Sequence, residues 1–516
     1  MQTGLDKRLA FPRREEAWPE GCPAAPWPPG FDASCEAPPA ARLPARLGTT
    51  RADVLTLYEQ LLPVGFLEEL GRQEGRRQNR RVYTDRVVMW LMVTQRLQGN
   101  GTLESGVLEL IRGLPASFWE RPCQRIRLAR EGKAVLSDNT ASYNEARQAL
   151  PRRVVEQGFD RVFQGWIEQA QATAPTAGLQ GFFLDGTTVR TPHTPELRQA
   201  YPPASNQYGE SHWPVLRMLV AHDLDTGLAL RPEWDSQQVS EQQLLERLLD
   251  RLPSEAILVG DVNFGVFSVA YRARQRQHPV LLRLQLCRAQ RICPEPLRDG
   301  IDRPVCWRPT PAECRKHGLP ADADVQGRLM VRQVQPSDGS PPFRLALFAT
   351  LDWPAEESFR LYGKRWFIET DLRSLKSTLE LEQLTCTSVE MVAKEINLAM
   401  LTYNLVRATA LLAAQAAGVA PRTFSFTRVR NVVQAFAPLI AHARDEHEAQ
   451  QIHAKMMYYV SRAKIRNRNR KRKSYPRAVW GRPQVHPKRK TEPRAGKASL
   501  EAKGGSGPAV SPVGRG

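Results

Sequence analysis

The stretch GFFLDGTTVR, residues 181–190, is where the periodicity of the sequence changes from helical to strand-like. Its apolar and aromatic residues fit a half-buried strand, and Asp185 stands where the apolar run stops. We predict a strand here that ends in a polar turn. The stretch therefore supplies both the start of a sheet and an acidic residue at the edge of that sheet.

Three further segments continue the pattern. Residues 214–230, PVLRMLVAHDLDTGLAL, predict a hairpin about an Asp-Thr-Gly turn. Residues 240–252, SEQQLLERLLDRL, predict an amphipathic helix with Ser240 as its N-cap. Residues 256–267, AILVGDVNFGVF, predict a short buried strand that ends at Asp261. The order of strand, hairpin, helix and strand indicates a mixed α/β sheet.

Asp185 and Asp261 each follow a predicted strand, and these two strands could lie side by side. Mg²⁺ is usually held by one or two carboxylates together with waters and phosphates, so the pair suggests a metal site. Aspartates at strand ends are also common turn formers. The metal hypothesis therefore needs a third carboxylate.

Residues 355–384, AEESFRLYGKRWFIETDLRSLKSTLELEQL, supply that carboxylate. On a continuous helix at about 100° per residue, four polar residues fall within an arc of about 60° beside the apolar stripe: Tyr362, Arg365, Glu369 and Lys376. A merely solvated face would lie opposite the apolar stripe. We therefore predict that these residues line a cleft, with one metal-binding carboxylate among three groups that contact phosphate oxygens.

The spacing Tyr-x2-Arg-x3-Glu-x6-Lys at 362–376 resembles the YREK signature of DDE transposases from bacterial insertion sequences, in the branch called insertion-sequence family four. The wider motifs agree, namely Asp185-Gly-Thr-Thr, Asp261-Val-Asn-Phe and Asn404-Leu-Val-Arg. The resemblance covers roughly residues 50–475. It joins both aspartates and the glutamate into one acidic triad.

The resemblance implies an RNase H-like catalytic core. Its acidic triad, Asp185, Asp261 and Glu369, would hold two Mg²⁺ ions, for which Mn²⁺ would substitute. The other signature residues would contact phosphates of the element ends: Tyr362, Arg365 and Lys376. The implied activity is cleavage of double-stranded DNA at the terminal inverted repeats and strand transfer into target DNA, usually by cut-and-paste, in a homodimer that pairs both ends.

The interval of 108 residues between Asp261 and Glu369 is too long for a simple connection inside a compact fold. In the family a β-rich insertion occupies it, and strand-like runs at 327–335 and 343–351 agree. Trp307 in this interval is a candidate to stack a flipped base near the cleavage point. A position in the hydrophobic core is the alternative for this tryptophan.

The net charge of +19 points to a polyanionic partner such as nucleic acid. Eighteen of the 73 Lys and Arg residues lie from position 455 onward, against two acidic residues. We predict nonspecific DNA contacts in this region, above all at Arg470, Lys471, Arg472 and Lys473. An extension that only promotes solubility is the alternative.

The sequence divides into segments of different composition. Helical periodicity before the sheet predicts a small all-helical domain, either a helix-turn-helix-like DNA-binding domain or a helical dimerisation or packing domain. The N-terminal end is rich in proline, and the C-terminal end is rich in glycine, proline and basic residues. Both compositions predict disorder. The predicted order is a Pro-rich segment (1–48), the helical domain (49–165), the RNase H-like core (178–287 and 352–415), the β-rich insertion (288–351), a C-terminal helical region for dimerisation or DNA contact (416–475) and a basic tail (476–516).

Other classes of protein fit the sequence poorly. No uninterrupted apolar run approaches the ~18–20 residues of a membrane span, and the N-terminus lacks the apolar region of a secretory signal. Eight widely spaced cysteines do not form a disulfide framework. We expect a cytoplasmic, nucleoid-associated bacterial protein without a membrane partner. Two rival functions remain, an idle transposase-derived DNA-binding protein and an RNase H-like nuclease without strand transfer.

Overall fold

A computed structural model of the 516-residue chain describes residues 53–76, 81–99, 101–171, 180–203, 205–206, 209–210, 213–336 and 341–465. The Pro-rich segment 1–48, the tail 476–516 and the basic residues Arg470, Lys471, Arg472 and Lys473 lie outside the described residues. The predictions made for them stay predictions.

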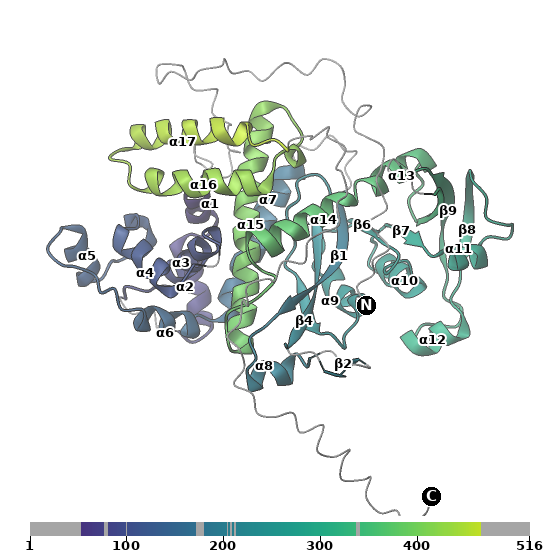
Figure 1. Cartoon of the computed structure of the whole chain (residues 1–516), viewed down its shortest axis with the longest axis horizontal. Coiled ribbons are helices and arrows are strands. Elements are labelled where there is room, and N and C mark those ends of the chain that lie inside the picture. Colours follow the sequence, from purple (N-terminus) through teal and green to yellow (C-terminus); the bar gives the residue numbers. More distant parts are fainter. Residues whose placement is uncertain are drawn as a thin grey trace, which may run out of the picture. The chain divides into compact units, whose positions relative to one another are not determined.

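One eight-stranded sheet forms the centre of the fold, in the order β5-β4-β1-β6-β7-β10-β9-β8 (Figure 1). Its strands are β1 (Gly181–Arg190), β4 (Val215–Asp223), β5 (Glu233–Ser236), β6 (Ile257–Gly260), β7 (Val280–Leu284), β8 (Ile301–Trp307), β9 (Val325–Val334) and β10 (Phe343–Ala349). β4 runs antiparallel to β1, whereas β6 and β7 continue the sheet in parallel. This mixed sheet confirms the α/β class. A separate pair joins β2 (Ser205–Asn206) and β3 (Gly209–Glu210).

Helices precede, interrupt and follow the sheet. Before it come α1 (Val54–Leu61), α2 (Val64–Gln73), α3 (Asp85–Leu97), α4 (Leu103–Arg112), η3 (Ala116–Phe118), α5 (Gln124–Arg130), α6 (Ala141–Ala149) and α7 (Arg152–Gln171). Between strands lie α8 (Pro195–Ala200), α9 (Glu241–Leu249), α10 (Phe267–Gln275), α11 (Leu286–Ile292) and α12 (Pro311–His317). After β10 follow α13 (Ala355–Gly363), α14 (Trp366–Arg373), η4 (Ser374–Thr378), α15 (Val389–Ala417), η5 (Pro421–Thr423), α16 (Phe426–Ala441) and α17 (Glu446–Ser461).

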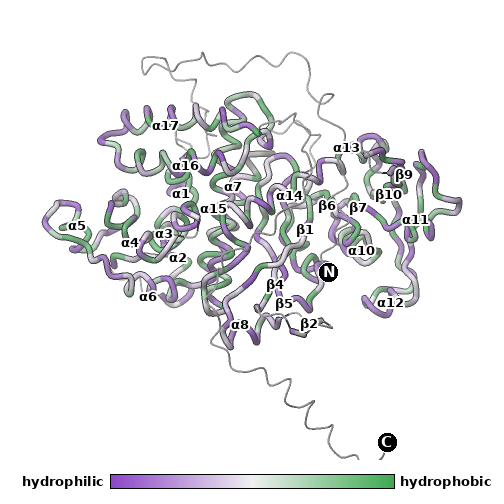
Figure 2. Tube along the Cα trace, in the orientation of Figure 1, coloured by the Kyte–Doolittle hydropathy of each residue, from purple (hydrophilic) through white to green (hydrophobic). Residues whose placement is uncertain are grey.

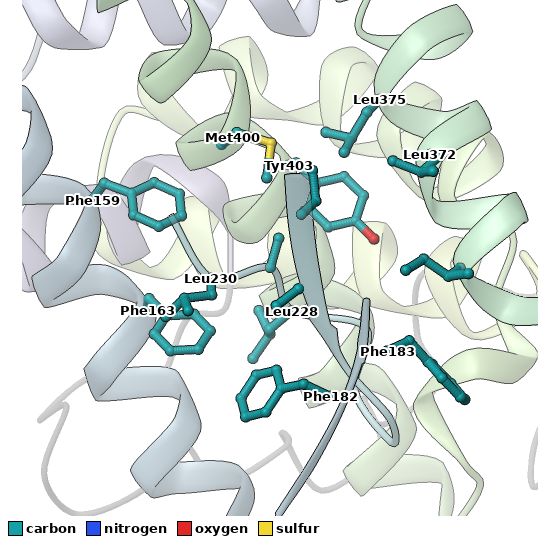
Figure 3. Close-up of a cluster of buried hydrophobic side chains, with 14 of the residues drawn as sticks. Phe159, Phe163, Phe182, Phe183, Leu228, Leu230, Leu372, Leu375, Met400 and Tyr403 are labelled. Carbon is teal, nitrogen blue, oxygen red and sulfur yellow. The ribbon is translucent and has the colours of Figure 1, made fainter. Parts of the chain in front are cut away.

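Both faces of β1 are covered. Phe182 and Phe183 are buried neighbours on this strand, so their side chains point to opposite faces of the sheet. On one face Phe163 of α7 contacts Phe182, with ring centroids 6.3 Å apart. α14 packs against β1 as well, and its Leu372 belongs to the same buried cluster (Figure 3). The first strand is therefore held in a core on two sides.

The long helix α15 lies between the N-terminal helices and the sheet (Figure 1). Glu395 on α15 forms a buried ion pair with Arg96 of α3. Further along α15, the Asn404 side chain exchanges two hydrogen bonds of 2.8 Å with the backbone of Ala229. By length and hydropathy α15 would suffice to cross a membrane, but its apolar window is completely buried in the fold. The helix is the central core helix of the described chain.

The predicted all-helical segment is present as α1–α7, but it shares its core with α15. Every residue of α3 is buried, because the helix packs between its neighbours and α15. A helix buried on all sides cannot enter a DNA groove. α3 is therefore a packed core helix, and a helix-turn-helix-like reader in this domain stays a prediction for its other helices.

The predicted β-rich insertion continues the core sheet. β9 and β10 confirm the two strand-like runs, and β10 pairs antiparallel with β7, with Leu347 opposite Arg283. Near the far edge α12 has no buried residue and is largely hydrophilic (purple in Figure 2). The insertion is thus an extension of the sheet that carries its own polar periphery.

The segment that was predicted as one helix over 355–384 is broken. α13 ends at Gly363, α14 begins at Trp366, and η4 is a π-helical turn that ends at Thr378. Glycine is a poor helix former, which favours the break. The prediction of one continuous helix was therefore wrong in its geometry.

Candidate active site

Asp185 lies in the middle of β1. β4 pairs with β1 along its whole length, with Asp185 opposite Val220 and Arg190 opposite Val215. The predicted polar turn after Asp185 is therefore wrong, because this pairing carries the strand on to Arg190. The carboxylate is fixed locally, since the N–H of Gly186 donates to its Oδ1 at 2.9 Å.

Asp261 is the first residue after β6. In the parallel register Phe183 lies opposite Val259, so two residues further along both strands bring Asp185 and Asp261 level with each other. The N–H of Asn263 donates to Asp261 Oδ1 at 2.9 Å and shapes the turn. The structure thus brings together the two aspartates that the sequence placed at the same sheet edge.

The pKa of Asp185 also reflects the nearby Asp261. Burial, and then the neighbouring Asp261, raise the pKa of Asp185 to about 8, while Arg365 acts in the opposite direction. Two adjacent carboxylates repel each other when both are ionised, so one of them retains its proton unless a cation is present. The pair therefore favours a positively charged ligand.

Glu369 projects from α14, and Arg365 stands one turn before it. Arg365 Nη2 donates to Glu369 Oε1 at 3.1 Å. The Glu369 side chain is 37% exposed, whereas that of Arg365 is buried. The charge of Arg365 also lowers the pKa of Asp185, against the effects of burial and Asp261.

Two of the predicted phosphate contacts lie apart from the solvent. Tyr362 is completely buried at the end of α13, and Arg365 is buried at the break before α14. Lys376 is half-buried in the π-helical turn. The cleft-lining stripe of four residues is thus not formed here, since the broken helix turns Tyr362 into the core.

Trp307 is a core residue. It is 2% exposed on β8, and its ring makes edge contacts with Phe267 and Phe348 at centroid distances of 5.8 Å and 5.0 Å. A base needs a free aromatic face to stack on. The structure therefore contradicts the base-stacking role and shows the alternative, a packed tryptophan. The exposed aromatic residue beside Glu369 is Trp366, at 45% exposure.

A fourth carboxylate at the site was missed by the sequence analysis. Glu241, the first residue of α9, accepts a hydrogen bond from Asn263 Nδ2 in the Asp261 turn. A Cβ atom at position 186 would lie only 2.0 Å from Glu241 Oε1, so Gly186 permits this approach. The capping motif at Ser240 located the helix start, but no local signal relates it to β1.

The donor set suits a hard divalent cation. Carboxylate oxygens are the ligands that Mg²⁺ prefers, and the like charges of Asp185 and Asp261 call for a counter-ion. Among the described residues, no group of three or more His, Cys, Asp or Glu side chains is arranged closely enough to hold a metal ion. In this arrangement Glu369 is instead held by Arg365.

Comparison with known proteins relates the segment that carries these residues to transposases. Residues 176–405 match the family described as the Transposase DDE domain. The transposase InsG for insertion sequence element IS4 of Escherichia coli K12 is 26% identical over 289 residues, 55% of this chain and 64% of that protein. The putative transposase InsZ of the same strain is 28% identical over 143 residues, 27% of this chain and 48% of that protein. The matches thus span less than two thirds of either relative.

Residues 176–405 are therefore similar to the DDE domain of transposases. The similarity to InsG relates the chain to the IS4-type transposases of bacterial insertion sequences. A piggyBac transposase synaptic complex with hairpin DNA aligns with a TM-score of 0.36 and 10% identity, over 83% of this chain and 88% of that chain.

Proposed function

We propose that the chain is a transposase that binds the terminal inverted repeats of an insertion sequence and catalyses metal-dependent DNA strand cleavage and strand transfer. The observation that carries this proposal is the juxtaposition of Asp185 and Asp261 on neighbouring strands, with Glu369 paired to Arg365 on the α14 helix that packs against β1. The match of this segment to the DDE domain supports it.

Transposases of the DDE class generally use divalent metal ions. Asp185, Asp261 and Glu369 would hold two Mg²⁺ ions, with Mn²⁺ as a substitute. When bound, such ions activate the attacking water or 3′-hydroxyl and stabilise the leaving oxygen of an in-line displacement. The raised pKa of Asp185 supports a role in binding cations, because a nearby positive charge favours its ionised form.

The basic side chains of the site would position the DNA. Arg365 donates to Glu369, so its planar fork could exchange Glu369 for a phosphate of the element end. Lys376 and Tyr362 are proposed as further phosphate contacts, the latter after a local rearrangement that exposes it. Arg470, Lys471, Arg472 and Lys473 would add nonspecific affinity.

The whole assembly would be a homodimer on double-stranded DNA. Two element ends must be joined to one target, so two active sites are needed on a paired complex. Cut-and-paste is the proposed route. The DNA and the partner subunit are the two macromolecules with which this chain would interact.

One experiment separates the proposed function from its rivals. The full chain is incubated with a labelled element end, a target plasmid and Mg²⁺, and the products are resolved on a gel. Joined product supports transposition. Cleaved ends without joining favour the nuclease, and a gel shift without cleavage favours the idle DNA-binding protein. A scrambled end of equal length controls for sequence recognition.

A further inference from the structure

A buried ion cluster lies on the side of α14 away from Glu369. Asp371 is completely buried and binds two guanidinium groups, Arg407 of α15 through Oδ1 and Arg422 of η5 through Oδ2 at 2.7 Å. His222 of β4 lies 3.9 Å from the same carboxylate. We call Asp371, Arg407, Arg422 and His222 the Asp371 cluster. Buried charges are costly unless they are paired, so this cluster fixes its members in place.

The cluster connects α14 to the sheet that carries the aspartates. Arg422 also donates to the carbonyl oxygens of Asp223, the last residue of β4, and of Leu224, which follows it. Tyr403 of α15 donates to the Gly227 carbonyl at 2.9 Å and accepts from Arg407 Nε at 2.9 Å. β4 is the neighbour of β1 along its whole length. Asp371 is therefore connected, through Arg422 and β4, to β1, the strand that carries Asp185.

The geometry of a helix makes this anchor important for Glu369. Residues two positions apart point about 200° away from each other around the axis, so Asp371 and Glu369 occupy opposite faces of α14. α14 has only eight residues and is bounded by a break and a π-helical turn. A helix of this length has little stability of its own, so its orientation must come from tertiary contacts.

The sensitivity of the site to this orientation is large. Rolling α14 by about 20° would move an atom about 5 Å from the axis by about 2 Å, whereas a functional group must be held within about 0.5 Å. Two guanidinium groups on the two oxygens of one carboxylate define its plane and oppose such a roll.

We infer that Asp371 is a positioning residue: the Asp371 cluster fixes the roll of α14 and thereby the placement of Glu369 relative to Asp185 and Asp261. This inference rests on the proposed function of the acidic triad. It assigns to Asp371 no contact with substrate or metal. Its role is to act through Glu369.

The test uses Asp371→Asn, which keeps the shape and removes the charge. The control is Glu395→Gln on α15, a buried carboxylate held by Arg96, Thr385 and Cys386, none of which belongs to α14. For each full-length protein we would measure unfolding by urea, binding to a labelled element end in Ca²⁺, and the cleavage rate as a function of Mg²⁺. Mn²⁺ affinity is measured separately by electron paramagnetic resonance.

We expect Asp371→Asn to bind the end normally but to cleave about 100-fold more slowly, the cost of misplacing a reacting group by about 1 Å. Its affinity for Mn²⁺ should fall by about 10-fold, and the Mg²⁺ concentration that gives half-maximal cleavage should rise by about 10-fold. Glu395→Gln should lose comparable stability yet keep the wild-type metal dependence. Wild-type cleavage and metal affinity in Asp371→Asn, or equal losses in Glu395→Gln, would overturn the inference.

Two further outcomes are distinguishable. If the wild-type protein cleaves no element end, the proposed function fails, and the Mn²⁺ affinities alone decide whether Asp371 positions Glu369. If Asp371→Asn does not fold, Arg422→Lys replaces it, because a lysine keeps the charge but cannot hold Asp371 and both carbonyls together. An unchanged metal dependence in that variant would contradict the inference.

Discussion

The two faces of α14 carry carboxylates with opposite surroundings. Glu369 is 37% exposed and has one guanidinium partner, Arg365. Asp371, two residues later, is fully buried between the guanidinium groups of Arg407 and Arg422. The exposed carboxylate is free to change partner, whereas the buried one is not. The difference teaches that one short helix can carry an accessible carboxylate on one face and a fully paired, buried carboxylate on the other.

The largest effect on activity should come from removing the carboxylates of the proposed acidic triad. Asp185→Ala, Asp261→Ala or Glu369→Ala should each abolish cleavage in Mg²⁺, because the displacement needs the metal ligands. Binding to the element end should persist, since phosphate contacts elsewhere supply most of the affinity. Cleavage assays and gel shifts on the same protein check both parts. Substantial cleavage by Glu369→Ala would refute the assignment.

Removing the buried carboxylate should cost more folding stability than removing the exposed one, although the exposed one is expected to matter more directly for cleavage. Asp371→Ala leaves two buried guanidinium groups without their carboxylate, and we expect it to lower the free energy of unfolding by about 3–5 kcal/mol. Glu369→Ala removes a half-exposed pair and should cost about 0–1 kcal/mol. Urea unfolding of both variants provides the measurement. Equal costs would show that the Asp371 cluster does not stabilise the fold.

The buried face should also respond to acid. Burial lowers the pKa of His222 to about 4, against the opposing effect of Asp371. The unfolded chain therefore binds more protons between pH 6.5 and 4, so stability is complete above pH 6.5 and falls by up to about 3 kcal/mol as the pH approaches 4. Unfolding at several pH values should show a shallower loss in His222→Gln.

Asp371 acts in a lower window. Burial would raise the pKa of Asp371, but Arg422 and Arg407 outweigh it and lower the value to about 2. Its contribution to stability is thus present above pH 3.8 and is lost as the pH falls towards 2. In His222→Gln this second loss should remain, which separates the two groups in one titration.

A moderate effect is expected for Arg365, the partner of Glu369 on α14. Arg365→Lys keeps the charge but loses the planar fork, and we expect about 10-fold less complex on element ends, equivalent to about 1.4 kcal/mol. Arg360→Lys on α13, an exposed pair with Glu357, is the matched control and should have no effect. An Arg365→Lys protein that assembles, cuts and joins like the wild type would contradict the phosphate role.

The smallest effect should come from a change remote from both faces. Deleting residues 476–516 removes nine basic and two acidic groups. If three of the basic groups contact phosphate, the slope of log K against log salt should become shallower by about 2.7. End binding from about 50 to 200 mM salt checks this. An unchanged slope would identify the tail as a solubility extension.

Much of the fold followed from local patterns. Apolar periodicity and turn residues correctly predicted three features: the N-cap Ser240, the strand at 343–349 and the turn after β4. Asp185 and Asp261 met because neighbouring parallel strands align their residues. These features depend on residues that are close in sequence or on the regular spacing of a sheet.

The rest depended on contacts that no local pattern encodes. Asp371 meets Arg407 and Arg422 across 36 and 51 residues, and only the folded chain brings them together. The prediction that Tyr362 lines a cleft assumed one unbroken helix over 355–384. In the structure the first helix of this segment, α13, ends at Gly363. Trp307 could be an exposed or a buried aromatic by sequence, and its packing against Phe348 decides the question.

The distance of 51 residues between Asp371 and Arg422 has a consequence for synthesis on the ribosome. At about 5–20 residues per second, Glu369 has left the peptidyl-transferase centre for roughly 3–10 s before Arg422 is added. During that time the nascent chain already contains all three acidic residues of the triad. It lacks the arginine that completes the anchor of α14, so a polypeptide released early would carry the reactive groups without their alignment.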